Sequence, residues 1–249
     1  MPDEIINVDI PQGKKEIMVE AYIESDKPIK MLVTENNLLS EALYPVLISN
    51  AQVKVYSDTA SVLLENTRDE YVEGKAYFNY QYGEAIGFKE GEVIHLDMIT
   101  PDGQQITASA PVMSKSVIGE IEVAERLFSV KTKADSVPEN RYFALEGTLY
   151  AEPENHYFRE IFDFSVQENE IVTLTIGHDV KIDSARVSLM HISKELYDFQ
   201  RSARQAYSAN IDNFTQPASV KGNVNGSLGI FTHYTKYDSM YRVSSLDTP

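Results

Sequence analysis

The chain has 249 residues, enough for one large or two modest domains, and its 43% apolar and 24% charged residues are typical of a globular protein with a core. Its 22 basic and 38 acidic residues give a formal net charge of −16, which would repel nucleic acid and anionic lipid headgroups. The absence of cysteine excludes disulfides, thiolate catalysis and cysteine-held zinc or iron–sulfur clusters.

Apolar and polar residues alternate in the first part of the chain, as they do in strands with one buried face. Residues 17–24 (IMVEAYIE) place apolar side chains on one face and Glu20 and Glu24 on the other. Residues 51–58 (AQVKVYSD) repeat the pattern. Both segments are therefore predicted to be strands of an antiparallel sheet.

A hairpin is predicted over residues 93–110, where two alternating segments flank the turn-forming residues 101–103 (PDG). Residues 109–117 (SAPVMSKSV) follow, with a proline and small polar residues. We place a domain boundary there, which divides the chain into residues 1–110 and 111–249.

Alternation resumes in the second half, which is therefore also expected to be mainly β. The alternating segments are residues 141–151, 157–166, 170–177 and 185–192. Residues 193–208 differ, because apolar side chains recur there at spacings of three and four and Ser193 can cap a helix. We predict a helix packed on the sheet, with Arg204 on its exposed face; a lid over a site is the alternative.

These elements predict a mainly β protein made of two antiparallel β-sandwich domains. The first is expected to be immunoglobulin-like, and the second to carry the helix as an insertion between strands. An α/β fold would require several helices, and the sequence shows the pattern of one.

A glycine-rich stretch, residues 222–234 (GNVNGSLGIFTHY), invites comparison with phosphate-binding loops. Its glycine spacing differs from theirs, no lysine follows at the required place, and the next residues read as a strand where a dinucleotide fingerprint needs a helix. Asn225 and Gly226 instead predict a type I′ hairpin turn. Gly229 predicts a bulge or a close approach of two backbones.

The sequence shows no recognisable catalytic constellation. Ser227 directly follows Gly226, so the G-x-S-x-G pattern of a nucleophile elbow is absent. The histidines are isolated, without the i, i+4 pair of zinc proteases, and no calcium-loop pattern occurs. We therefore predict no catalytic residue, no metal and no cofactor. An acidic pair joined only by folding, as in glycoside hydrolases, stays open as an alternative.

Tyrosine is abundant, with 15 copies, whereas tryptophan is absent. Residues 78–82 and 231–237 place aromatic side chains in rows on strand faces. Such rows can stack on sugar rings or anchor a protein partner, although core and cross-strand packing is the alternative. The candidate ligand-binding residues are Tyr80, Tyr82, His233, Tyr234 and Tyr237.

Six stretches carry a resemblance to a known family: IMVEAYI, AQVKVY, IHLDMITPDGQQITASAPVM, HYFREIF, VSLMHISKELYDF and PASVKGNVNGSLGIF. Through them, nearly the whole chain resembles the family catalogued as domain of unknown function 4249. The last stretch is the most specific, and its matching positions are Pro217, Asn223, Gly226, Gly229 and Phe231.

The resemblance implies an outer-membrane lipoprotein of Gram-negative bacteria that serves nutrient import through TonB-dependent transporters. It also implies a lipid anchor on an N-terminal cysteine that this sequence does not contain. No catalytic residues are assigned to the family. We therefore expect a non-enzymatic protein, anchored at the cell surface or the periplasmic face of the outer membrane, that binds a ligand such as a glycan or a transporter. The alternatives are a secreted hydrolase and an adhesin or structural surface module.

Overall fold

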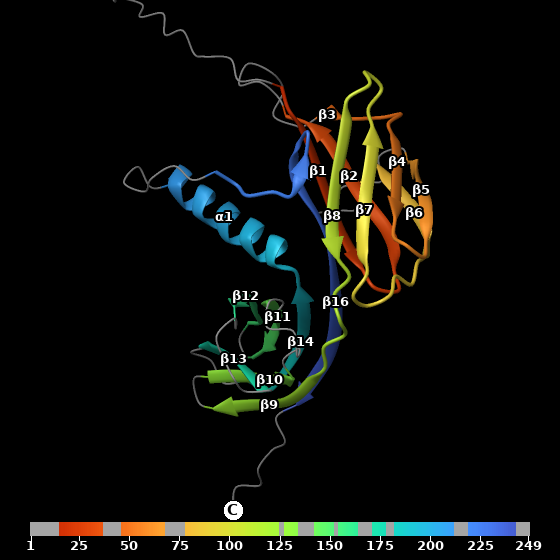
Figure 1. Cartoon of the computed structure of the whole chain (residues 1–249). Coiled ribbons are helices and arrows are strands. Elements are labelled where there is room, and N and C mark those ends of the chain that lie inside the picture. Colours follow the sequence, from red (N-terminus) through yellow and green to blue (C-terminus); the bar gives the residue numbers. More distant parts are fainter. Residues whose placement is uncertain are drawn as a thin grey trace, which may run out of the picture.

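The computed structural model (Figure 1) describes residues 15–36, 46–67, 78–124, 127–133, 142–151, 154–163, 171–177, 182–211 and 219–242. Within these ranges the chain forms a large mixed sheet, a small second sheet and one helix. The prediction of a mainly β, sandwich-like protein is confirmed. Pro217, one of the positions that carry the family resemblance, lies outside the described residues.

The first half of the chain folds into antiparallel strands that curl into two facing layers (Figure 1). Its strands are β1 (Ile17–Glu24), β2 (Pro28–Glu35), β3 (Val46–Leu47), β4 (Gln52–Tyr56), β5 (Ser61–Asn66), β6 (Tyr80–Ala85), β7 (Val93–Ile99) and β8 (Gln105–Pro111). Alternation in β1 works as predicted, because Val19 and Ala21 are buried between the layers whereas Glu20 points away from that core.

The second half contains a sheet covered on one face by a helix and on the other by a three-stranded sheet (Figure 1). Its elements are β9 (Ile118–Ala124), β10 (Leu127–Lys133), β11 (Tyr142–Tyr150), β12 (His156–Asp163), β13 (Ile171–Gly177), β14 (Ser184–Ile192), α1 (Lys194–Ile211), β15 (Val224–Asn225) and β16 (Leu228–Arg242). Phe128 of β10 and Phe143 of β11 are fully buried between the two sheets.

One long strand, β16, joins the two halves. Its residues 228–234 pair with β1 in parallel, and its residues 234–242 pair with β14 in antiparallel orientation. The large sheet therefore runs without a break from β12 to β15, and the parallel pair makes it mixed where the sequence predicted antiparallel pairing alone. The division into residues 1–110 and 111–249 stays a prediction, but β15 and the first half of β16 pair with strands of the first half of the chain.

The helix prediction is confirmed, since α1 begins directly after Ser193 and extends three residues beyond the predicted end. The Leu196 N–H donates a hydrogen bond to the Ser193 hydroxyl at 3.2 Å, which is the expected N-cap contact. Leu196 is buried against Tyr142 and Ile192 of the sheet beneath. The apolar stripe of the helix therefore fixes it on the sheet.

The predicted hairpin is present as β7 and β8, which pair in antiparallel orientation around Gly103 at φ +87°. The second predicted turn is different. Gly226 does have a positive φ of +83°, but Asn225 does not lie in the left-handed region, and β15 pairs with β8 while β16 pairs with β1. The type I′ hairpin prediction is wrong, because the chain crosses here from one layer of the sandwich to the other.

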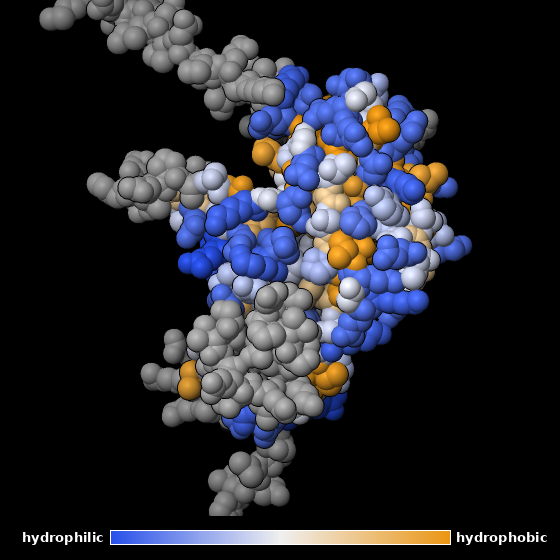
Figure 2. Space-filling model, viewed as in Figure 1, coloured by the Kyte–Doolittle hydropathy of each residue, from blue (hydrophilic) through white to orange (hydrophobic). Residues whose placement is uncertain are grey.

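The face seen in Figure 2 is mostly hydrophilic, in keeping with the acidic composition, and its exposed apolar residues occur singly or in small groups. Within the part of the chain that the structure describes, no helix combines the length and the apolar character needed to cross a membrane.

Candidate functional site

A groove of about 540 Å³ lies between α1 and the sheet that the helix covers. Small-molecule sites commonly occupy about 300 to 1,000 Å³ and have mainly apolar linings with a few polar groups. The apolar lining comes from both sides of the groove, and its residues are Ala144, Met190, Ile192, Leu196, Phe199 and Ala203. The groove therefore has the size and the floor of a binding site.

The sheet side of the groove follows from the register of its strands. Ala144 of β11 lies opposite Met190 of β14, and the next residue pair along that face places Ile192 beside Tyr234 of β16. The intervening residues of β11, such as Leu145, point into the core on the other face. This sheet is thus apolar on both faces near the helix, which explains why the alternation in residues 141–151 is imperfect.

The helix side of the groove follows from helical spacing. The residues of α1 that line the groove stand at positions i, i+3, i+4, i+7 and i+8, which is one face of an α-helix. Gln200 and Arg204 belong to this face, between the apolar positions. Arg204 was predicted to point into solvent; it does remain more than half exposed, at 58%, but it also lines the groove.

Two tyrosines of adjacent strands, Tyr22 of β1 and Tyr234 of β16, line the groove. The Tyr22 hydroxyl donates to Glu20 Oε2 at 3.3 Å, and the Tyr234 hydroxyl donates to Glu24 Oε2 at 3.1 Å. Burial, reinforced by these carboxylates, raises the pKa of both phenols above the ordinary value. At neutral pH both hydroxyls therefore stay protonated and donate hydrogen bonds to Glu20 and Glu24.

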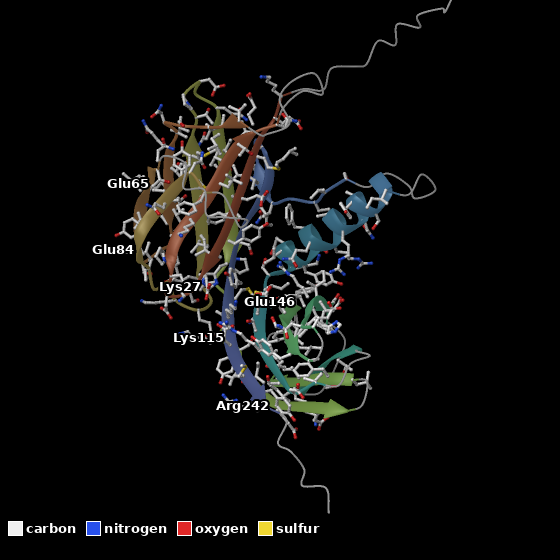
Figure 3. All side chains as sticks on the ribbon, turned by 180° about the vertical axis from the view of Figure 1, so that it is seen from behind. Lys27, Glu65, Glu84, Lys115, Glu146 and Arg242 are labelled. Carbon is white, nitrogen blue, oxygen red and sulfur yellow. The ribbon has the colours of Figure 1, made fainter. Side chains whose placement is uncertain are left out.

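The charged rim consists of Arg159 on β12, Glu146 on β11 and Arg204 on α1. Arg159 Nε lies 3.9 Å from Glu146 Oε2, and Arg204 Nη1 lies 3.7 Å from Glu160 Oε2. Both separations exceed hydrogen-bond length, so each is a loose ion pair. Glu146 also contacts Lys236 Nζ at 3.4 Å, and Figure 3 shows Glu146 on the sheet beside the helix.

Two of the predicted ligand-binding residues lie in the interior. Tyr80 has no exposed surface, and its hydroxyl accepts a hydrogen bond from the Ala51 N–H at 2.8 Å. His233 is 1% exposed; its Nδ1 accepts from the Met113 N–H at 3.1 Å, and its Nε2 lies 3.1 Å from the Ser25 hydroxyl. A ligand at the surface cannot reach either side chain, so both are packing residues.

The other three predicted residues lie apart from one another. Tyr82 is half-buried on β6 and donates to Glu84 Oε2 at 3.2 Å. Tyr237 is 38% exposed on β16 opposite Leu189. Of the five residues, Tyr234 alone lines the groove. The aromatic rows therefore do not form one site.

Sequence reasoning missed Tyr22, Arg159 and Arg204 as groove residues. One local signal pointed to Tyr22, because it stands on the polar face of β1 between Glu20 and Glu24, where an aromatic side chain is out of place in a purely solvated face. Arg159 and Arg204 gave no such signal.

The described residues contain no group of three histidines or carboxylates that could hold a metal ion. Glu146 is the one carboxylate among the described residues that line the groove, and two cations contact it. Chemically, the groove offers an apolar floor, two guanidinium groups and hydrogen-bonded phenols.

Together, the fold and the groove define a mainly β, sandwich-like protein with a groove between its one described helix and the sheet. The chain belongs to the family described as Domain of unknown function (DUF4249), whose model matches residues 3–239. This match confirms the family resemblance seen in the sequence. No curated protein matches the chain.

Proposed function

We propose that this protein is a non-enzymatic binding protein that holds a small ligand in the groove between α1 and the sheet. In this proposal it is a lipid-anchored protein of the outer membrane, at the cell surface or the periplasmic face, and assists a TonB-dependent transporter in nutrient uptake. The groove of about 540 Å³, with its apolar floor and charged rim, is the observation that carries the binding role. The family resemblance supports the role in uptake.

The composition of the groove favours binding over hydrolysis. A glycoside hydrolase needs two carboxyl groups about 5 to 9.5 Å apart, one of them with a raised pKa. Among the described lining residues Glu146 is a single carboxylate, and Arg159 and Lys236 hold it in ion pairs. The described lining therefore offers one carboxylate where this chemistry needs two.

The exposed surface gives less support to an adhesin. Adhesive modules are expected to present large apolar or aromatic patches to a partner. Tyr157 on β12 and Tyr207 on α1 are well exposed, at 81% and 69%, but they belong to different elements. The face in Figure 2 shows scattered apolar residues in a hydrophilic surround.

The binding role is tested by blocking the groove. Saturation-transfer NMR with a panel of glycans, short peptides and small organic acids should detect binding to the wild-type protein. Ala203→Phe places a ring on α1 in the space between helix and sheet, and should therefore abolish this binding. Ala85→Phe is the matched control, since Ala85 is exposed on β6 and lies outside the groove. Equal binding by both variants would remove the groove as the site.

The cellular role needs a separate test in the organism that carries the gene. The full native gene, with its own upstream region and an affinity tag, should yield a membrane-bound product that incorporates radioactive palmitate. A TonB-dependent transporter should co-purify with it from detergent extracts. A product without the lipid label would contradict the anchor, and a clean preparation without a transporter would contradict the partnership.

A further inference from the structure

The chemistry of the groove also indicates what kind of ligand it takes, an inference that rests on the proposed binding role. We infer that the groove binds a small amphipathic carboxylic acid. Its apolar body lies between the floor of the sheet and α1, and its carboxylate is held by Arg159 and Arg204.

The apolar lining of the groove indicates that most of the ligand is apolar. Met190 and Ile192 of β14 and Leu196 of α1 line the groove with apolar side chains, and neighbouring protein atoms cover most of each, since they are 7%, 1% and 3% exposed. A sugar placed there would lose water from its hydroxyl groups without gaining hydrogen bonds, which is costly. A hydrocarbon chain or ring placed there loses nothing and buries apolar surface.

The tyrosines do not change this preference. A sugar stacked on their rings would still need hydrogen-bond partners for its own hydroxyl groups. Here the Tyr22 and Tyr234 hydroxyls already donate to Glu20 and Glu24. They stand at the border of the groove, where they can contact an apolar ligand through their rings.

The two arginines indicate that the ligand carries a carboxylate. Arg159 and Arg204 come from opposite sides of the groove, β12 and α1, and are 54% and 58% exposed. Their contacts with Glu146 and Glu160, at 3.9 and 3.7 Å, are too long to be hydrogen bonds. Guanidinium donors are therefore available for a ligand, and a planar guanidinium matches the two oxygens of a carboxylate.

The charges nearby also limit the ligand to a single negative charge. Glu146 and Glu160 stand beside the two arginines, and the whole protein carries a formal net charge of −16. A polyphosphate would be repelled by these carboxylates and by the overall field. A monocarboxylate can use the arginines with a smaller repulsive penalty, because it carries a single negative charge.

Displacement of a fluorescent fatty acid tests the inference directly. The protein is titrated with 11-(dansylamino)undecanoate, and the bound probe is displaced by decanoate or by decan-1-ol, which share the same chain length. At neutral pH and low salt, decanoate should compete about tenfold or more better than decan-1-ol. Arg159→Gln and Arg204→Gln should each weaken decanoate about tenfold and leave decan-1-ol unchanged. Arg186→Gln, on the exposed side of β14 and outside the groove, should behave as wild type.

The outcomes separate this inference from the proposed function. One outcome is that decanoate and decan-1-ol compete equally well and that both lose binding in Ala203→Phe. This outcome would contradict recognition of a ligand carboxylate but would keep the groove as the binding site. Better displacement by a neutral oligosaccharide such as maltohexaose would overturn the ligand class. Retention of the probe by Ala203→Phe would overturn both the site and its ligand. Arginine variants that lose decan-1-ol as strongly as decanoate would contradict a specific carboxylate contact.

Discussion

Gly229 of β16 lies so close to Val19 of β1 that a β-carbon on residue 229 would fall 1.9 Å from the Val19 carbonyl oxygen. Its φ of +116° is also one that other residues rarely adopt. The two residues are partners in the parallel pairing that attaches β16 to the first half. The glycine-rich stretch therefore serves backbone packing, and the predicted close approach at Gly229 is confirmed.

Gly229→Ala should lower the free energy of unfolding by about 3 kcal/mol or more, because the new methyl group meets backbone that cannot move aside and the backbone conformation is strained. Urea unfolding followed by circular dichroism measures the change. Gly87→Ala is the control, since a β-carbon there meets nothing within 4 Å, and it should change stability by less than about 0.5 kcal/mol. Equal losses in the two variants would contradict the role of the Val19 contact.

Tyr80→Phe should cost about 1 to 2 kcal/mol, because the buried Ala51 N–H loses its hydrogen-bond acceptor. Tyr82→Phe removes a hydroxyl that contacts the exposed Glu84, and should cost much less. Chemical unfolding of both variants makes the comparison. Neither variant should alter displacement of the dansyl probe, and a loss of probe affinity in Tyr80→Phe would show that the interior assignment is incomplete.

Stability should fall as the pH drops from about 6.5 to about 4, because burial lowers the pKa of His233 from 6.5 to about 4. The unfolded chain then takes up a proton at a pH where the folded protein does not, so acid favours unfolding. The nearby His191 lowers this pKa further, and Asp26 opposes the shift. At about 1.4 kcal/mol per pH unit, the full loss is about 3 kcal/mol.

Urea unfolding between pH 7 and pH 4 measures this dependence. His233→Asn should flatten the profile over that range, because residue 233 no longer takes up a proton on unfolding. His156→Asn, at the partly exposed start of β12, is the control for the substitution itself. An unchanged slope in His233→Asn would show that other groups govern the response to acid.

Ser193→Ala should destabilise the protein by about 1 kcal/mol, because the Leu196 N–H loses its cap and the contact between the Ser193 and Thr232 hydroxyls disappears. Since α1 forms one wall of the groove, affinity for the dansyl probe should fall as well. Ser208→Ala, whose hydroxyl bonds to the Arg204 carbonyl near the exposed end of the helix, should change both quantities less. Thermal unfolding and probe titration give the two readings.

Local patterns were enough to predict most of the strands and the helix. The alternation in residues 17–24 and 93–110, and the three- and four-residue spacing after Ser193, depend only on near neighbours in the chain. Turn chemistry at Gly103 worked for the same reason. At Asn225 and Gly226 it failed, because the strands on either side of the turn pair with different partners.

Local patterns could not predict how deeply a side chain is buried in the folded protein. Tyr80 and Tyr82 share a strand face, as the period of two requires, yet one is fully buried and the other half-buried. The difference depends on which layer covers each position. His233 is buried for a similar reason, since residues 112–117 run past β16 and the Met113 N–H meets its ring.

By itself, the sequence determined a mainly β chain with one capped helix, an acidic surface and glycines suited to turns and close backbone contact. The groove was decided by tertiary structure. It joins Tyr22, Arg159 and Arg204, which are far apart in the chain and meet because β16 pairs with β1 on one side and β14 on the other. Long-range strand pairing brings these side chains together, and no spacing within a short segment encodes it.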